Sequence, residues 1–396
     1  MTNFEKPITF IHTADWHIGN PFSRFERDMR KKLKQAIFFS IEMIFIYAQK
    51  YEIPLILCAG DIVDNGQLCP KEDLYKLFEI IKKYPTIRIV MIAGNHDPLL
   101  SRNIYSQVDK VNYPPNLTLV QGDEELPYPE WNMTIFASSL REKNGTFNPL
   151  HWLKEKTLHP ERINIGLCHG SIKNETFAAN NFPIEPDFAI THHLDYLALG
   201  DWHSYTQINP RTFYPGVPEP LSFDENGAIL KITFTGPEKK LAVEKIPIAK
   251  YKWKRMEEHV FVDTFNQFKT TLETVGEKEI RELIVSGFLP LETYKTYKEL
   301  LDMNKHRYVE IKDNVVVQPD DQALLNSADG CLRDVIQRLL ELKKSGEPLA
   351  KEILNPYVSI ARTQVFQQVE ELAKNRHEII DQALLKIYTY LKEKAQ

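Results

Sequence analysis

The sequence predicts an α/β layered sandwich over roughly its first 245 residues, followed by a small α+β module and a helical tail. Short apolar segments alternate with helical or loop segments along this first part, which is the pattern of packed α/β layers. Several of the apolar segments are continuous, as expected of strands that are buried on both faces. The chain of 396 residues is long enough for two or three domains at roughly 150 residues each.

Eight apolar segments are predicted to be strands, and two segments with apolar residues at three- and four-residue spacing are predicted to be helices. Strands and helices in this alternation are expected to pack as layers. The strands are expected at 8–13, 55–59, 87–92, 117–120, 133–138, 163–168, 196–199 and 228–234, and the helices at 30–51 and 71–83.

The composition shifts near Pro247, and residues 251–258, which are dense in charged and aromatic side chains, are predicted to connect two domains. Residues 260–319 follow the order of a small α+β module, with a helix, a strand, a second helix and two short strands. The later elements are expected at 282–288 (strand), 291–303 (helix), 308–311 (strand) and 315–318 (strand).

The pattern is helical from Asp320 onwards. Gly346 is expected to end one helix, and Asn355 followed by Pro356 is expected to cap and start another. We therefore expect three domains, at residues 1–248, 249–319 and 320–396.

The chain carries 49 Lys and Arg against 54 Asp and Glu, a formal net charge of −5. This balance gives no support for a nucleic-acid substrate, although bound metals and a partner can supply positive charge. The N-terminal residues lack the order of a signal peptide, and the most apolar stretch, 36–48, is too short to span a bilayer. Cysteines at 58, 69, 168 and 331 show no paired or zinc-like spacing. We therefore expect a cytoplasmic protein with free, buried thiols and no membrane segment.

Five short segments place metal-ligand side chains directly after an apolar strand, where the C-terminal edge of a sheet opens into a crevice. They are Asp15-Trp16-His17, Gly60-Asp61-Ile62-Val63-Asp64, Gly94-Asn95-His96-Asp97, His169-Gly170 and Gly200-Asp201-Trp202-His203. Carboxylates, imidazoles and an amide without thiolates suit Mn²⁺, Fe²⁺, Mg²⁺ or Zn²⁺. Each segment alone is a weak signal, because a histidine after a strand is more often structural. Five segments in this order predict a metal site.

This ordered set resembles the calcineurin-like metallophosphoesterase superfamily, whose pattern is D-x-H, G-D-x-x-D, G-N-H-D, G-H or H-G, and G-x-H. The resemblance covers about residues 8–220. Within the superfamily, the sequence is most similar to the SbcD-type DNA repair nucleases, through HTADWHIGNPF, AGDIVDNG, IAGNHDP, LALGDWH and YPGVPEP. The resemblance implies a four-layer α/β/β/α sandwich for residues 1–248, a small α+β capping domain and a helical tail that binds an ATPase.

The resemblance also implies two divalent metal ions, expected to be Mn²⁺ with Mg²⁺, Fe²⁺ or Zn²⁺ as alternatives, which share the carboxylate of Asp61. The other implied ligands are Asp15, His17 and His203 at the first ion and Asn95, His169 and Asp201 at the second. Two such ions clamp a phosphodiester and activate the attacking water. By the same resemblance, His96 is the general acid or a donor to the phosphate, and Asp97 orients His96.

Two of these acidic positions have more than one interpretation. Asp201 stands where many SbcD-type nucleases carry a histidine. Its carboxylate either binds a metal, with a preference for a harder ion, or stays outside the coordination sphere. Asp64 either contacts substrate, supports Asp61 or serves only to shape a turn.

Other conspicuous residues are interpreted as structural. His12 lies within a strand and is expected to be a hydrogen-bonded core imidazole, and Trp16 is expected to pack beside the site. His192 and His193 precede a strand without matching a ligand position, so they are placed at the surface or behind the ligands. Arg24 is expected in a solvated loop, with contact to a DNA backbone as the alternative.

The main functional prediction is a two-metal nuclease of the SbcD type that processes or repairs DNA ends. The resemblance implies exonuclease action on double-stranded ends, endonuclease action on single strands, an SbcC-like coiled-coil ATPase partner and a homodimer. One alternative is a phosphodiesterase or phosphatase for a substrate other than DNA. Another is a DNA-end or ATPase-binding subunit whose metals are structural.

An apolar stripe in the last helical segment, 378–394, bears on the partner prediction. It either packs against the other helices of the tail or docks onto the ATPase as a helix in a groove. The stripe consists of Ile380, Leu384, Ile387, Tyr388 and Leu391.

Overall fold

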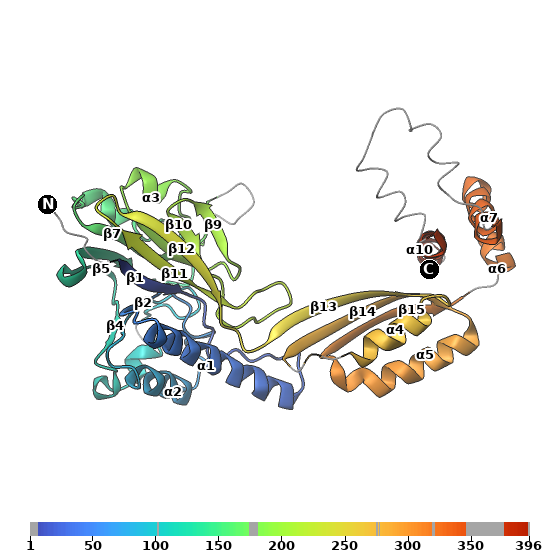
Figure 1. Cartoon of the computed structure of the whole chain (residues 1–396), viewed down its shortest axis with the longest axis horizontal. Coiled ribbons are helices and arrows are strands. Elements are labelled where there is room, and N and C mark those ends of the chain that lie inside the picture. The colour runs from blue at the N-terminus through green and yellow to red at the C-terminus, as the bar shows by residue number, and fades with distance from the viewer. Residues whose placement is uncertain are drawn as a thin grey trace. The chain divides into compact units, whose positions relative to one another are not determined.

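In the computed structural model of the chain, the described residues are 7–100, 103–173, 181–274, 276, 278–318, 321–345 and 376–394. The chain divides into two compact units, Met1–Trp253 and Lys254–Gln396, and each is considered by itself (Figure 1). Among the described residues, no helix is both long and apolar enough to cross a bilayer. Cys58, Cys69 and Cys168 are buried free thiols as expected, whereas Cys331 is exposed.

The first unit contains two six-stranded sheets. The first sheet has the strand order β12-β11-β1-β2-β3-β4, in which β1 to β4 run parallel and β11 pairs antiparallel with both β1 and β12. Its strands are β1 (Ile8–Thr13), β2 (Leu55–Cys58), β3 (Arg88–Met91), β4 (Leu117–Leu119), β11 (Ala228–Thr235) and β12 (Lys240–Pro247).

The second sheet has the order β5-β6-β7-β8-β10-β9. Its central strands β6, β7, β8 and β10 are parallel, and the two edge strands are antiparallel to their neighbours. Its strands are β5 (Asp123–Tyr128), β6 (Met133–Ser138), β7 (Ile163–His169), β8 (Tyr196–Gly200), β9 (Thr206–Asn209) and β10 (Thr212–Tyr214).

The two sheets pack face to face around a shared apolar core. Phe10, Leu57 and Val90 of the first sheet lie in one buried cluster with Ile165 and Tyr196 of the second. Helices α1 (Arg27–Lys50) and α2 (Lys71–Lys82) lie beside the first sheet, and each buries one stripe (Figure 1). The short helix α3 (Phe188–Thr191) and the 3₁₀ turn η4 (His151–Glu155) cover the second sheet through a separate cluster. The prediction of an α/β sandwich is therefore confirmed.

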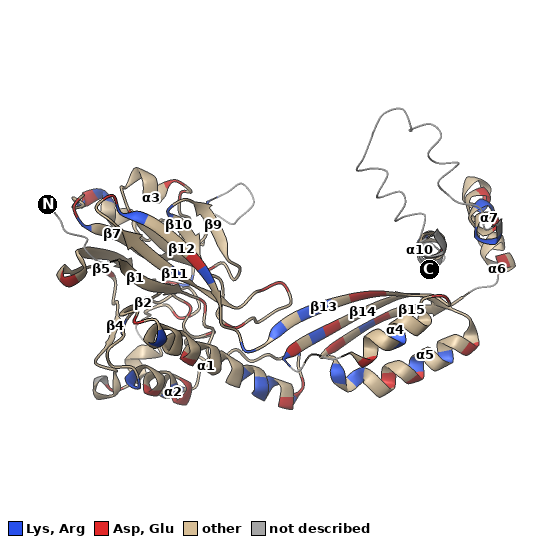
Figure 2. Ribbon diagram, viewed as in Figure 1, with Lys and Arg blue, Asp and Glu red and all other residues tan. Residues whose placement is uncertain are grey.

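The second unit is built on a three-stranded sheet of order β13-β14-β15, with β14 parallel to β15. Helices α4 and α5 share one apolar cluster with this sheet, and α6, α7 and α10 share another with Phe261 and Phe288. Side chains of both charge signs lie along these strands (Figure 2). The elements are β13 (Lys252–Val260), α4 (Phe265–Glu273), β14 (Glu279–Leu289), α5 (Leu291–Asn304), β15 (Glu310–Val317), α6 (Asp321–Asn326), α7 (Gly330–Ser345) and α10 (Arg376–Lys394).

The structure refines two predictions for this region. Residues 251–258 were expected to connect two domains, and the boundary between the two compact units does fall among them, between Trp253 and Lys254. Nearly all of these residues belong to strand β13, along which most side chains are exposed or half-buried. The two short strands expected at 308–311 and 315–318 are one continuous strand, β15. The interrupting residues, Lys312 and Asp313, keep the pairing with β14: Lys312 is exposed, and Asp313 accepts a hydrogen bond from the Tyr297 hydroxyl over 2.7 Å.

The apolar stripe of the last helix packs within the second unit. Ile380 and Leu384 are buried in the cluster that also holds Ile336 and Leu340 of α7. The interpretation of this stripe as packing against the tail's own helices is therefore confirmed for these residues. The helix start expected at Asn355 and Pro356 lies outside the described residues. The described residues also form 3₁₀ turns at Tyr105–Gln107, Lys110–Asn112, Pro129–Trp131 and Lys305–Arg307.

Candidate metal centre

The polar segments that follow five strands meet at one edge of the sandwich. Contacts between the two sheets close this edge: His169 Nδ1 lies 2.8 Å from the Ala59 carbonyl oxygen, and the Asp201 N–H donates to Asp15 Oδ1 over 3.1 Å. The ends of β1, β2, β3, β7 and β8 carry, in this order, Asp15 and His17; Asp61 and Asp64; Asn95, His96 and Asp97; His169; and Asp201 and His203.

Four of these residues adopt backbone conformations that side chains other than glycine rarely take. The φ angles are +54° at Asp15, +46° at His17, +52° at Asp61 and +114° at Asp201. Such strain persists only where the surroundings fix the backbone, and it concentrates at functional sites. Here the Asp15 N–H donates to the Gly60 carbonyl and the His17 N–H to the Asp61 carbonyl, each over 3.0 Å.

Two glycines of the motifs are required by close approach to the ligands. A Cβ at Gly94 would lie 2.2 Å from Asp61 Oδ1, and a Cβ at Gly60 would lie 2.6 Å from His169 Nδ1. Gly60 also has φ = +92°. Any side chain at either position would displace a predicted ligand, so the glycines are part of the site's architecture.

The first predicted ligand group is formed by Asp15, His17 and His203, which each offer an atom within 4.8 Å of the others. His17 Nε2 and His203 Nε2 are only 3.0 Å apart. On its other side, His203 Nδ1 lies 3.0 Å from Glu225 Oε1. A carboxylate at Nδ1 fixes the ring so that Nε2 faces inward, as in many metal-bound histidines.

The second group contains Asp15, Asp61 and His169 within the same distance of one another. The Nδ1 of His169 must donate, because its partner is the Ala59 carbonyl. Its Nε2 then faces further oxygen atoms, Asn95 Oδ1 at 3.1 Å and Asp61 Oδ1 at 3.5 Å. A neutral ring cannot donate from both nitrogens, so this arrangement suits either an imidazolium or a ring bound to a cation.

Asp61, a member of the second group, also lies close to the first. Its Oδ1 is 3.5 Å from His169 Nε2, and its Oδ2 is 3.8 Å from His17 Nε2. The carboxylate is buried, and Oδ1 also accepts the His96 N–H over 2.9 Å. One oxygen toward each group is the arrangement that a bridging carboxylate needs.

The carboxylate of Asp201 is held by two side chains that the sequence analysis did not identify. Ser171 Oγ donates to Oδ2 over 2.5 Å, and Asn181 Nδ2 donates to Oδ1 over 2.8 Å. Its Oδ1 also lies 3.9 Å from His169 Nε2, within reach of the second group. Direct metal binding and an orienting role from outside the coordination sphere are both compatible with this position.

His96 stands at the exposed rim of the centre. Its Nδ1 lies 2.6 Å from the backbone carbonyl of Asp64, so this nitrogen donates and Nε2 is left to face the site. The side chain of Asp64 accepts from Asn20 Nδ2 over 2.7 Å and lies 3.4 Å from His17 Nδ1. Asp64 therefore supports both histidines.

Asp97 does not orient His96 as expected, and its role is corrected accordingly. The ring of His96 takes its hydrogen bond from Asp64, whereas Asp97 is fully buried and holds two loops of the centre together. Its donors are the amides of Ile62 (2.8 Å), Val63 (3.2 Å) and Gly94 (2.7 Å) and the hydroxyl of Tyr105 (2.5 Å).

Burial and mutual charge shift the pKa values of these groups. Burial raises the pKa of Asp15 to about 6. Burial alone would lower the pKa values of His169 and His203, but the surrounding carboxylates outweigh it and raise both to about 9. Burial also works against the charge of Asp61, yet the nearby histidines bring its pKa below the ordinary value. The centre is thus a dense, buried set of acids and imidazoles.

The donor set fits the two divalent cations that the sequence resemblance implies. Oxygen and imidazole ligands without thiolates suit Mn²⁺, Fe²⁺, Mg²⁺ or Zn²⁺. The oxygen atoms around His169 Nε2 and the approach of His17 Nε2 to His203 Nε2 at 3.0 Å gather donor atoms of the kind that a divalent cation would take as ligands. Asp15, His17 and His203 would hold one ion, Asn95 and His169 the other, and Asp61 both.

Three residues interpreted as structural can now be placed. His12 is buried and bonded to the Tyr196 hydroxyl (2.9 Å) and the Leu199 carbonyl (3.1 Å), which confirms a satisfied core imidazole. Trp16 is buried and donates to Thr13 Oγ1, which confirms packing. Arg24 is not simply solvated: it donates to the Leu221 carbonyl over 3.2 Å and stacks on aromatic rings.

Comparison with protein families matches residues 8–205, half of the chain, to the calcineurin-like phosphoesterases. The chain therefore belongs to this family and is a metallophosphoesterase, a class of divalent-metal-dependent hydrolases of phosphoesters.

Curated relatives are distant. The chain is 25% identical over 233 residues to the uncharacterized metallophosphoesterase YhaO of Bacillus subtilis (strain 168), covering 56% of this chain and 55% of the relative. It is 25% identical over 265 residues to the SbcD component of the nuclease SbcCD of Escherichia coli (strain K12), covering 56% and 62%. It is 23% identical over 247 residues to the DNA double-strand break repair protein Mre11 of Methanopyrus kandleri, covering 56% and 52%. The chain thus spans little more than half of these relatives.

Proposed function

We propose that this protein is a two-metal phosphodiesterase that cleaves DNA. The observation that supports this proposal best is that the predicted ligands from five strand ends converge on one buried cluster. Asp61 has one carboxylate oxygen toward His17 and the other toward His169, and His96 lies at the open rim. A bridging carboxylate flanked by two ligand groups suits a pair of ions, and a pair of ions suits phosphodiester hydrolysis.

The residues of the chain have separate roles in the proposed reaction. When bound, the ions supply an activated water and neutralise charge on the phosphoryl oxygens. His96 presents Nε2 to the site because Nδ1 donates to the Asp64 carbonyl, and only the imidazolium form of the ring would carry the Nε2 proton that is given to the leaving oxygen. Asp97 fixes the loops that carry Asp61 and His96 by binding their backbone amides.

The DNA substrate and the partner are supported by the relatives. Two of them are a nuclease component and a DNA double-strand break repair protein by name. We extend the proposal to Mn²⁺ as the physiological ion, exonuclease and endonuclease action, an SbcC-like ATPase bound through the C-terminal helices, a homodimer and a cytoplasmic location.

The test is a cleavage assay on end-labelled linear duplex and on single-stranded circular DNA, with Mn²⁺, Mg²⁺ or EDTA. Asp61→Asn is expected to lower cleavage by about 10³-fold or more, because both ligand groups lose their shared charge, while the thermal midpoint stays close to that of the parent. Asp28→Asn, on an exposed position of α1, is the matched control and is expected to cleave normally.

The outcome also separates the rival functions. If the protein with the ATPase and ATP leaves DNA intact but hydrolyses a small phosphodiester, the substrate proposal is wrong and the phosphodiesterase assignment stands. If the metal-loaded protein is inert on every phosphoester, the enzymatic proposal itself is wrong.

A further inference from the structure

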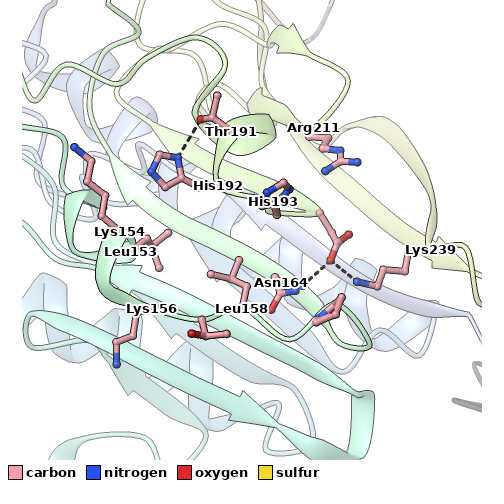
Figure 3. A pocket seen from close by; sticks show the side chains of 13 residues that line it. Leu153, Lys154, Lys156, Leu158, Asn164, Thr191, His192, His193, Arg211 and Lys239 are labelled. Carbon is pink, nitrogen blue, oxygen red and sulfur yellow. Dashed lines mark hydrogen bonds and ion pairs between the residues drawn. The ribbon is translucent and has the colours of Figure 1, made fainter.

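A second polar site lies in the first unit at the opposite edge of the second sheet. A pocket of about 810 Å³ opens where strands β7 and β8 begin (Figure 3). Asn164 at the start of β7 lines it, whereas His169 at the end of the same strand belongs to the metal centre. Five residues of strand, about 16 Å at about 3.3 Å each, separate the two. The pocket is therefore distinct from the metal centre.

The lining is strongly cationic. It includes Lys154, Lys156, Arg211, Lys239 and two histidines but a single carboxylate, Asp195. Lys156 Nζ is paired with Glu125 Oε2 at 3.3 Å, outside this lining. The Asp195 carboxylate is already engaged, because its Oδ2 accepts from Lys239 Nζ over 2.9 Å and from the backbone N–H of Asn164 over 2.8 Å. The pocket thus keeps an excess of positive charge, which favours an anionic ligand.

Arg211 and His193 are two of the basic residues that line the pocket. Arg211 Nη1 donates to the Leu194 carbonyl over 2.9 Å, which fixes the guanidinium and uses one of its five N–H groups. His193 lies on the same side of the pocket (Figure 3) and is held in the left-handed conformation with φ = +55°. A guanidinium fork beside an imidazole suits a phosphate group.

Asn164 provides an independent indication of a ligand. Its Nδ2 donates to the His159 carbonyl (2.9 Å) and the Arg162 carbonyl (3.1 Å), so its other amide atom is the acceptor Oδ1. Asn164 is only 2% exposed, and within the described part of the chain Oδ1 has no hydrogen-bond donor. A buried acceptor of this kind calls for an N–H or O–H group.

The opposite wall is apolar. The half-buried Leu158 lines the pocket together with Leu153, which is 2% exposed, and both pack in the cluster that covers the second sheet. The ligand chemistry therefore combines an anionic group, a hydrogen-bond donor and a face that packs on aliphatic side chains. The volume lies within the roughly 300–1,000 Å³ of small-molecule sites.

We propose that this pocket binds a nucleoside 5′-phosphate. The phosphate lies against Arg211 and His193, the base packs on Leu153 and Leu158, and a sugar hydroxyl or base N–H donates to Asn164 Oδ1. This proposal is independent of the reaction at the metal centre, since the residues that line the pocket are not among the predicted metal ligands.

The test is calorimetric titration of the full-length, metal-loaded protein with AMP, inorganic phosphate and adenosine. AMP is expected to bind saturably, and to bind equally well to Asp61→Asn, which removes phosphate binding at the metal centre. Arg211→Gln and His193→Asn are each expected to weaken AMP binding by about tenfold or more. Asparagine tolerates the left-handed backbone at position 193, so this variant tests the imidazole without disturbing the fold. Lys32→Gln, at an exposed position of α1, is the control and should bind AMP as the parent does.

Several results would overturn the proposal. AMP binding that is absent, that is lost in Asp61→Asn, or that is unchanged in both pocket variants would show that the pocket is not the binding site. Equal affinity for AMP and inorganic phosphate would remove the nucleoside from the proposal. Binding of a short single-stranded oligonucleotide without binding of AMP would indicate that the pocket binds a nucleic-acid strand rather than a mononucleotide.

Discussion

The role of His96, at the exposed rim of the metal centre, can be tested separately from the roles of the predicted metal ligands. Replacement of His96 by alanine is expected to lower kcat on DNA by about 10²–10⁴-fold, because the leaving oxygen loses its proton donor. Bound metal should stay unchanged by elemental analysis, since His96 is not among the predicted ligands. The loss should be smaller on a nitrophenyl ester, whose leaving group needs no proton.

The matched control for this prediction is His306→Ala, an exposed histidine of the second unit. It should retain the parent's kcat on both substrates. Cleavage of DNA at the parental rate by His96→Ala would remove the general-acid role, and an equal loss on both substrates would indicate a contact to the phosphate instead.

At the residue scale, the sequence identifies side chains that follow strands but not the partners that position them. Asp61 and His169 are recognisable because each stands directly after an apolar run. Glu225, which bonds His203 from 22 positions away, and Ser171 and Asn181, which hold Asp201, obey no spacing rule. Only the folded loops bring them into contact.

At the scale of elements, long buried strands are more predictable than edge strands or very short strands. β1 and β6 have the predicted bounds, since most of their residues are apolar and buried. The strands that were not predicted are β5, β9, β12 and β13, which are sheet edges, and β10, an interior strand of three residues, whereas the edge strand β4 was predicted. Exposed and half-buried residues alternate along β5 and β12. Charged side chains on the open face of an edge strand hide the apolar periodicity.

A single buried glutamate links all three strands of the sheet in the second unit. Glu282 of β14, whose side chain is 2% exposed, accepts from Arg255 Nε of β13 over 2.5 Å and from Lys312 Nζ of β15 over 2.6 Å. Burial opposes the charge, but the two cations outweigh it and bring the pKa of Glu282 below its ordinary value.

This linkage predicts a pH-dependent effect of Glu282→Gln. Because the pKa is lower in the folded state, the stabilisation is present above the unfolded value of about 4.5 and is lost as the pH falls through the folded value. The variant should unfold at lower urea concentration at neutral pH, with a loss of about 1–3 kcal/mol, and the difference should shrink in acid. Glu292→Gln, whose side chain is 84% exposed, should show almost no loss. A difference that is independent of pH would contradict this account.

At the scale of the whole molecule, the metal centre and the nucleotide pocket both belong to the first unit. The predicted ligands run from Asp15 to His203, and the apolar clusters of the two units share no residue within the described parts of the chain. The first unit should therefore fold and hydrolyse a small phosphodiester by itself.

The end of the first unit is set by packing contacts and hydrogen bonds rather than by the change in residue composition. The predicted boundary at residue 248 follows the shift in residue types near Pro247, but Trp253 packs against Phe25 and Phe223 with ring centroids 5.7 and 5.0 Å apart and is 6% exposed. Glu219 also accepts the backbone N–H groups of residues 250 and 251, over 2.6 and 3.1 Å. A boundary at 248 would cut through these contacts.

A fragment of residues 1–253 is accordingly expected to be more stable than one of residues 1–248 by about 3–5 kcal/mol, because the shorter one lacks a buried tryptophan and leaves a buried acid without its amide donors. Urea unfolding of the two fragments, followed by circular dichroism, measures the difference. The longer fragment with Trp253→Ala separates the ring from the backbone, and it should fall between the two. Equal midpoints for both fragments would mean that Trp253 packs there only in the intact chain, and the first unit would then end where the composition changes.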